Sequence, residues 1–290
     1  MLTPESFAGQ VLVTVLTSPD LYLIDPAHPQ PVLVHSFSGY LSLLGIVEVQ
    51  HDDFYVIVGN YSQPTNTNTP GSWNVYHVNM RDQPPHVRLS THFPGANLLD
   101  GMAVLNAEDG LLLVGDAGAG VVYRLNVHTG AIAIVIDDAT MKPPAGAPVG
   151  IDGVQIRDNT LYFTNAPKGL FVGIPLKADG TAAGPAEVLA TGLEVDDFAF
   201  DSAGSAYISV TFSNEMAKLQ SGISGGANVS DAAHIASENM LAGPTACKLG
   251  RLETDREMLY VTTTGGLGIA DGSSKPGGTL SRVNIRRFVA

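Results

Sequence analysis

Apolar and polar residues alternate in six segments of the chain, and each segment consists of two apolar runs separated by a turn rich in Gly or Asn. The apolar positions are filled mainly by Val, Ile, Leu, Tyr and Phe. A period of two with these residue types predicts β-strands, because successive side chains of a strand point to opposite faces. The pattern therefore predicts six pairs of antiparallel strands, which begin at Val11, Phe54, Leu111, Leu161, Ala206 and Leu259.

The spacing of these strand pairs indicates how they are arranged. They recur about every 50 residues, an interval typical of propeller blades. The chain contains 32 glycines and 18 prolines, and no segment shows the periodicity of a helix. We therefore predict an all-β fold, a six-bladed β-propeller of four-stranded antiparallel blades around a central channel. Residues 1–290 form a single domain in this prediction, and a strand shared between the chain ends closes the ring.

The expected face of the functional site follows from the geometry of a blade. The start of each innermost strand and the turn between the second and third strands lie on the same face. Asp100, Asp152 and Asp196 each occupy such a start, so we expect their carboxyl groups to meet in one central cavity as candidate catalytic groups. A plain turn role remains open for each Asp. Two of the turns are long, and we expect residues 63–73 and 262–278 to fold over the mouth as lids.

The charge balance narrows the classes of partner. The chain carries 15 basic and 28 acidic residues, a formal net charge of −13, and it lacks the basic stripe that nucleic acid or an anionic membrane would require. No stretch is long and apolar enough to span a membrane, and the first residues do not resemble a signal peptide. We expect a soluble protein with neither nucleic acid nor membrane as partner, with the cytoplasm slightly favoured. The lone Cys247 excludes an internal disulfide and is expected to be a small buried residue.

With that repeat pattern, the strand starts resemble those of the senescence-marker-protein and gluconolactonase family of six-bladed propellers. In that family, residues at these positions hold a central divalent cation, usually calcium. The resemblance implies Asp152 and Asp196 as metal ligands, and Glu5 is the candidate for a further ligand from the first blade. The family's substrate-contacting Asn is replaced here by Leu99. Calcium prefers six to eight oxygen ligands, and carboxylates that converge without a cation raise one another's pKa. Either a cation is bound, or one Asp is protonated.

Three further stretches, PTACKLGRLETDREMLYVTTTGG, SWNVYHVNM and VDDFAFDSAGSAYIS, resemble a fungal subgroup of these propellers. This subgroup includes the hetero-Diels-Alderases of tropolone-sesquiterpenoid biosynthesis, which join an o-quinone methide to a terpene olefin. Such a cycloaddition requires no cofactor, because it depends on holding two partners in near-attack geometry. For this reaction we expect a largely apolar mouth with a few polar groups, and the candidate substrate-binding residues are Trp73, Leu99, Asn165, Phe198 and Thr245.

Three functions are therefore open at the level of the sequence. The first is an enzyme of fungal secondary metabolism that cyclises small, largely apolar substrates, with an o-quinone methide and a terpene olefin as the expected pair. The second is a calcium-dependent lactone or ester hydrolase, in which the cation polarises the carbonyl and a carboxylate acts as base. The third is a propeller that binds a ligand without catalysis. Metal dependence distinguishes the first two.

Overall fold

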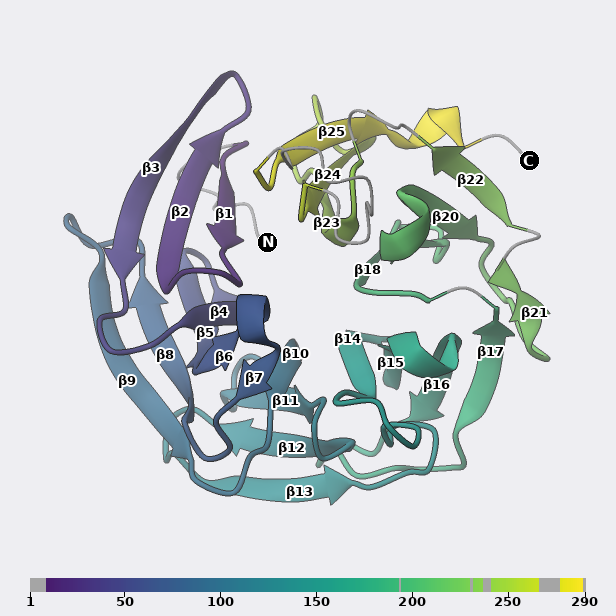
Figure 1. The fold of residues 1–290 in the computed structure, drawn as a ribbon, viewed down its shortest axis with the longest axis horizontal. Helices are drawn as coiled ribbons and strands as arrows, with labels where there is room; N and C mark the ends of the chain where they lie inside the picture. Colours follow the sequence, from purple (N-terminus) through teal and green to yellow (C-terminus); the bar gives the residue numbers. More distant parts are fainter. Residues whose placement is uncertain (1–8, 193, 230–231, 237–240, 266–276, 289–290) are drawn as a thin grey trace.

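The computed structural model describes residues 9–192, 194–229, 232–236, 241–265 and 277–288. Its strands form six antiparallel blades arranged in a ring around a central channel, as predicted (Figure 1). In the described part of the chain, every helix is a short 3-10 turn, and none is long and apolar enough to cross a membrane.

The blades follow one another in chain order. Blade 1 consists of β1 (Val11–Thr14), β2 (Asp20–Asp25) and β3 (His28–Ser36); blade 2 of β4 (Ser42–Gln50), β5 (Asp53–Gly59), β8 (Trp73–Asn79) and β9 (His86–Phe93); blade 3 of β10 (Leu99–Asn106), β11 (Leu111–Asp116), β12 (Val121–Asn126) and β13 (Ile132–Ile136). Blade 4 consists of β14 (Ile151–Arg157), β15 (Thr160–Asn165), β16 (Leu170–Pro175), β17 (Glu187–Thr191) and β21 (Ala227–Asn228); blade 5 of β18 (Phe198–Phe200), β19 (Ala206–Val210), β20 (Glu215–Leu219) and β22 (Ala233–Ala236); blade 6 of β23 (Pro244–Leu249), β24 (Met258–Thr263) and β25 (Leu280–Asn284).

Short elements connect these strands. A small hairpin of β6 (Tyr61–Ser62) and β7 (Thr67–Asn68) follows β5 and contains the 3-10 turn η1 (Gln63–Thr65). The turns η2 (Ala166–Lys168) and η3 (Thr211–Ser213) occupy the corresponding connection in blades 4 and 5, and η5 (Ile285–Arg287) follows β25. The hairpin, η2 and η3 lie on the face seen in Figure 1, which is the face where the innermost strands begin.

Two details differ from the regular four-stranded blade. Blades 1 and 6 each contribute three described strands, and β1 pairs only with β2 while β25 pairs only with β24 among the described strands. The strand that we expected the chain ends to share is therefore not among them. The second difference is β21, which leaves blade 5 and adds a parallel fifth strand to β17 of blade 4.

The core consists of layers of apolar side chains between adjacent blades. The largest layer lies between blades 2 and 3 and includes Trp73, Phe93 and Leu99, all of which are fully buried. Corresponding layers follow between the next blades around the ring. Blades 1 and 6 meet through Val11 and Tyr260, so side-chain packing joins the two ends of the ring. A strand inside a propeller packs against a neighbouring blade on each face, so β5, β11 and β19 are buried almost continuously along their length and not at every second residue.

The innermost strands begin with an irregularity that positions the site. In β10 the pairing with β11 shifts between Leu99 and Met102, and β14 and β4 show the same shift one blade away on either side. One extra residue on the innermost strand produces this shift, which is a β-bulge, and bulges often redirect side chains next to functional sites. Gly101 belongs to this bulge, and a Cβ there would collide with the backbone of Asp152 in the next blade. Glycine is therefore required where consecutive bulges pack together.

Candidate functional site

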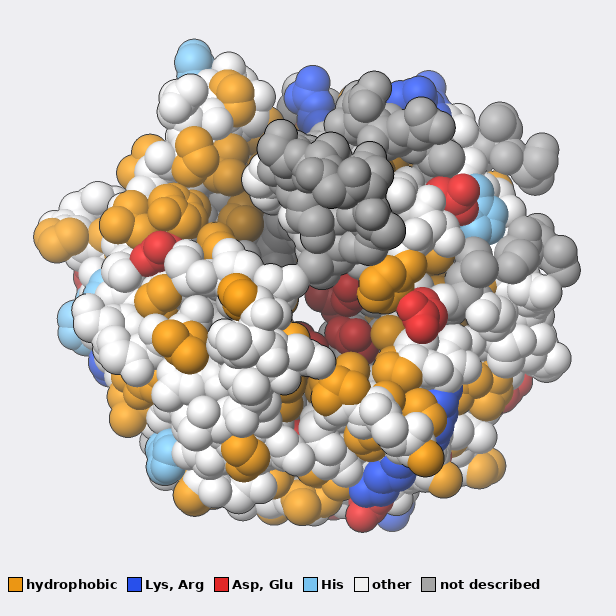
Figure 2. Space-filling view, viewed as in Figure 1, with side chains coloured by type: hydrophobic (Ala, Val, Ile, Leu, Met, Phe, Trp, Pro, Cys, Tyr) orange, Lys and Arg blue, Asp and Glu red, His pale blue; other side chains and the backbone are white. Residues whose placement is uncertain are grey.

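The bulges place one residue from each of five neighbouring blades around the mouth of the channel. By register these residues are Leu44, Asp100, Asp152, Asp196 and Thr245. In blade 5 the bulge is visible in the hydrogen bonds, because Ser209 accepts from the Asp196 amide and donates its own amide to the carbonyl of Asp197. Figure 2 shows the central hollow of this face with acidic side chains inside it.

The three predicted carboxyl groups interact directly with one another. Asp152 is central, with side-chain hydrogen bonds to both Asp100 and Asp196. Burial raises the pKa of Asp152 well above its ordinary value, and the charges of Asp196 and Asp100 raise it further. Burial also raises the pKa of Asp100, with additional contributions from Asp197 and Asp196. Two carboxyls that share a hydrogen bond can be close together only if one is protonated, so the neutral form is favoured here.

Asp196 differs from the other two because its carboxylate accepts hydrogen bonds from a hydroxyl and from a backbone amide. Burial and the neighbouring Asp197 raise its pKa to about 7, while hydrogen bonds from Thr211 and from the Asp197 amide oppose that rise. The Thr211 hydroxyl lies 2.9 Å from a carboxyl oxygen of Asp196 and 2.7 Å from the carbonyl of Pro244. Near neutral pH the cluster therefore combines carboxyl groups that can donate a proton with one that is partly ionised.

The structure adds two residues that were not predicted for the site. Asp197 occupies the bulge position that is glycine in the preceding blades, and its side chain packs directly over Gly153. Burial raises the pKa of Asp197, whereas the charge of Lys248 lowers it. Burial in turn lowers the pKa of Lys248. Glycine follows the Asp at the start of β10 and of β14, and its absence after Asp196 was the sequence signal for Asp197. Lys248 gave no such signal.

The carboxyl groups of the mouth are the candidate ligands for a calcium ion. Carboxylate oxygens are chemically suitable for calcium. However, within the described ranges no three His, Cys, Asp or Glu side chains form a group that could hold a metal ion. The carboxyls of Asp152 and Asp196 interact with each other as a hydrogen-bonded pair. In this arrangement they do not fit a calcium centre. Glu5 lies outside the described residues.

Three of the predicted substrate contacts lie in the core and not at the mouth. Trp73, Leu99 and Phe198 have no exposed surface. Trp73 and Leu99 belong to the layer between blades 2 and 3, and the ring of Phe198 packs edge-on against Phe171 between blades 4 and 5. A substrate could reach them only if these layers opened. In each case the apolar residue flanks a bulge or follows a turn, and tertiary packing decides which way such a side chain points.

The two polar candidates differ from each other. Asn165 is fully buried and immediately precedes η2. Its side-chain amide donates to the carbonyls of Thr140 and Lys142, and its side-chain oxygen accepts from the backbone amide of Lys168. These contacts satisfy the side chain and hold a turn in place. Thr245 lies at the mouth with part of its surface exposed, next to Asp197, whose amide donates to the Thr245 carbonyl over 3.1 Å.

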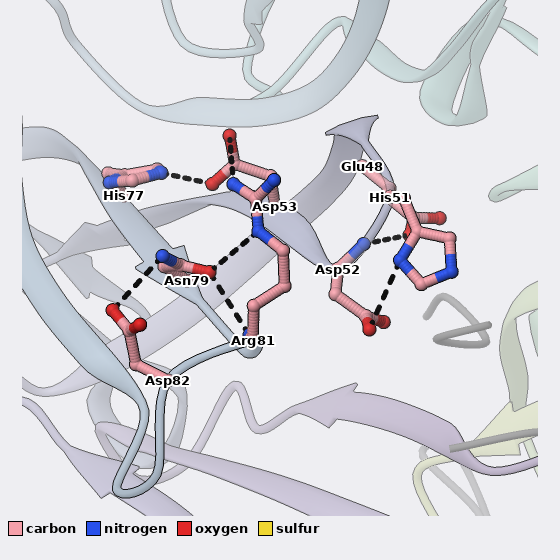
Figure 3. Close-up of polar contacts among 8 residues, drawn as sticks. All are labelled: Glu48, His51, Asp52, Asp53, His77, Asn79, Arg81 and Asp82. Atoms are coloured by element: carbon pink, nitrogen blue, oxygen red, sulfur yellow. Dashed lines mark hydrogen bonds and ion pairs between the residues drawn. The ribbon is translucent and has the colours of Figure 1, made fainter. Parts of the chain in front are cut away.

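A second acidic group lies at the opposite end of blade 2, where β4 ends and β5 begins (Figure 3). Asp53 contacts His77 and also lies 3.6 Å from the Arg81 guanidinium. Glu48 forms an ion pair with Arg251 of blade 6. Each of these carboxylates therefore has a basic partner. The remaining members of the group are His51, Asp52, Asn79 and Asp82.

The chain is similar to curated proteins of one name and to solved structures of several names. No protein-family model matches the chain. A "Putative hetero-Diels-Alderase" from a Phoma species is 28% identical over 261 residues, which are 81% of this chain and 73% of that protein. A second putative hetero-Diels-Alderase, from Sarocladium schorii, is 28% identical over 273 residues, and the alignment covers 81% of this chain and 66% of that protein. The predicted resemblance to the hetero-Diels-Alderase subgroup is confirmed at this level of identity.

Solved structures show the same fold. Regucalcin from Agrobacterium tumefaciens, described as a calcium-binding protein, superposes with a TM-score of 0.63 and 13% identity, covering 93% of this chain and 82% of that one. A luciferin-regenerating enzyme superposes with a TM-score of 0.64 and 12% identity, covering 95% of both chains. The predicted resemblance to the senescence-marker-protein fold is thus confirmed. At such low identity these structures establish the architecture and nothing about activity.

Proposed function

We propose that this protein is an enzyme that binds small, largely apolar substrates in the mouth of the propeller and accelerates a cyclisation, specifically a hetero-Diels-Alder addition. The observation that carries the proposal is the similarity over 81% of the chain to two proteins with that name. In the proposed reaction an o-quinone methide and a terpene olefin form one new carbon–carbon and one new carbon–oxygen bond at the expense of two π bonds. Nothing leaves, and no electrons are exchanged with a cofactor.

The acidic mouth supports this reaction through hydrogen bonding. As the two partners combine, electron density accumulates on the carbonyl oxygen of the o-quinone methide. A donor that is already in place can stabilise that oxygen at little reorganisation cost. Asp100 and Asp152 are half-buried carboxyl groups whose raised pKa values favour the protonated, donating form. In this proposal they bind the oxygen, while the walls of the mouth hold the olefin in a reactive orientation.

The test is to generate an o-quinone methide in the presence of a cyclic terpene olefin, with and without the purified protein. The expected result is a faster addition that favours one stereoisomer. Replacing Asp152 by Asn should reduce both effects. The matched control is Asp179→Asn, since Asp179 is an exposed turn residue whose carboxylate binds Thr181. Equal rates and a racemic product with and without the protein would overturn the proposal.

The calcium-dependent lactonase is the rival that the fold suggests. It requires carboxylates that converge on one cation, and the described carboxyls of the mouth bind one another through hydrogen bonds. The same preparation should therefore also be assayed for lactone hydrolysis with added calcium. Calcium-dependent hydrolysis in the absence of any effect on the cycloaddition would favour the lactonase.

A further inference from the structure

The hairpin β6–η1–β7 forms a flap at the mouth between blades 2 and 3. Tyr61 pairs with Asn68 across it, and Ser62 pairs with Thr67. Asn66 closes the flap in the left-handed conformation, with φ of 48°, which Asn adopts more readily than most residues. The flap spans residues 61–68 and therefore contains the first part of the expected lid 63–73, while Tyr61 and Ser62 precede that segment.

The flap is fixed to the body of the propeller through Trp73. The indole N–H lies 3.1 Å from the side-chain oxygen of Asn68 and 2.7 Å from the carbonyl of Asn97. The amide of Asn68 also donates to the carbonyl of Asn97, over 2.6 Å. Trp73 is the one tryptophan of the chain. Its fluorescence therefore reports on the position of the flap.

Tyr61 connects this flap to the acidic mouth. Its ring packs against the apolar layer between blades 2 and 3, and its backbone amide donates to the hydroxyl of Ser42 at the start of β4. Its hydroxyl donates to the side-chain oxygen of Asn66 over 3.0 Å. Burial raises the pKa of Tyr61, and the charge of Asp100 raises it further. Because Ser42 begins β4, Tyr61 lies beside the bulge from which Leu44 reaches the mouth.

We propose that Tyr61 is a catalytic residue whose hydroxyl donates a hydrogen bond to the carbonyl oxygen of the substrate. The role of Tyr61 in the reaction rests on the proposed function, whereas its role in binding a ketone does not. Asn66, whose side-chain oxygen accepts the hydrogen bond of the Tyr61 hydroxyl, is exposed. A substrate oxygen can take over that hydrogen bond at little cost in free energy, because water can then hydrogen-bond to the Asn66 oxygen. Tyr61 then places a donor on the wall of the mouth formed by blade 2, where the ring of carboxyls is interrupted by Leu44.

The first experiment measures the cycloaddition with Tyr61→Phe, which retains the packed ring and removes only the hydroxyl. The expected result is a fall in kcat of about 10- to 100-fold with a smaller change in KM, because the hydrogen bond strengthens in the transition state. The matched control is Tyr40→Phe, since Tyr40 lies in the connection between β3 and β4 and its hydroxyl hydrogen-bonds with that of Tyr76 in β8. A wild-type rate in Tyr61→Phe overturns the catalytic role.

The second experiment is independent of the reaction. Chromone, a planar unreactive ketone, and naphthalene, a hydrocarbon of similar shape, are titrated while the fluorescence of Trp73 is followed. The expected result is that Tyr61→Phe binds chromone about three- to tenfold more weakly and naphthalene as well as the wild type does. Unchanged chromone affinity, or no chromone binding by the wild type, overturns the inference. A selective loss of chromone binding in a protein that accelerates no cycloaddition would retain Tyr61 as a ketone ligand and reject the proposed function.

Discussion

The two acidic groups of this propeller are built on opposite principles. At the end of blade 2 opposite to the mouth, Asp53 and Glu48 each face a basic side chain. At the mouth, four aspartates face one another, and Lys248 is the side-chain cation that acts on Asp197. A buried charge is tolerated when an opposite charge neutralises it. Without such a partner, burial shifts the pKa of the group towards its neutral form.

The unfavourable arrangement of charges is at the mouth, where carboxyl groups face one another. A cluster of like charges weakens folding, whereas paired charges at the other end do not. Such clusters of perturbed carboxyls are characteristic of functional sites, although structural networks can also produce them. The contrast between the two groups can be tested by changing one member of each group and measuring both activity and stability.

The largest expected effect is on catalysis at the mouth. Replacing Asp100 by Leu should lower the rate of cycloaddition about 100-fold, because a donor to the substrate oxygen is lost. Asp100→Asn should recover part of the rate, since its amide can still donate. Stopped-flow or product analysis would measure both variants. A Leu variant that is fully active would show that the carboxyl cluster does not take part.

The next effect is on stability at the opposite end of blade 2. Asp53→Ala leaves His77 without its carboxylate partner, and the His77 side chain is only 11% exposed. An unsatisfied buried polar group costs about 1–3 kcal/mol, so the midpoint of chemical denaturation should fall while catalysis by the folded protein is retained. A loss of activity at unchanged stability would mean that this group is functional, and the comparison would then fail.

A smaller effect concerns the dependence of stability on pH. The pKa of Asp196 rises from an ordinary value of 3.8 to about 7 on folding, so the folded chain binds this proton more tightly than the unfolded chain. Its contribution to stability is fully present below pH 3.8 and is lost as the pH rises towards 7. Asp196→Asn should therefore raise the thermal midpoint at pH 8 and flatten its decline between pH 5 and 8. A steeper decline in the variant would contradict the assignment.

The smallest expected effect is that of removing divalent cations. In the arrangement that we propose, Asp152 shares protons with Asp100 and Asp196, and these protons take the place of a cation. Treatment with a chelator should leave the thermal midpoint and the rate unchanged. Calorimetry with added calcium provides the complementary measurement. Stoichiometric binding that is lost in Asp152→Asn would show that the mouth is a metal site and that the carboxyls rearrange around it.

The sequence by itself determined the architecture and which three aspartates meet at the mouth. Alternation of apolar and polar residues is a local property of a strand, and six repeats of it led to the propeller that the structure shows. The repeated Asp at the strand starts likewise led to Asp100, Asp152 and Asp196, because equivalent positions in successive blades face the same channel. Cys247 is also buried as expected, with 2% of its surface exposed, and burial raises the pKa of its thiol to about 12.

Only the tertiary structure decided which neighbouring residue faces the mouth. Leu99 and Asp100 are adjacent in sequence, but the bulge turns Asp100 to the channel while Leu99 enters the layer between two blades. Asp197 and Tyr61 approach the same cluster from blades 5 and 2, which are separated in sequence and brought together by closure of the ring. Local periodicity is blind to both effects, because a one-residue bulge reverses the direction of a side chain and long-range packing selects its neighbours.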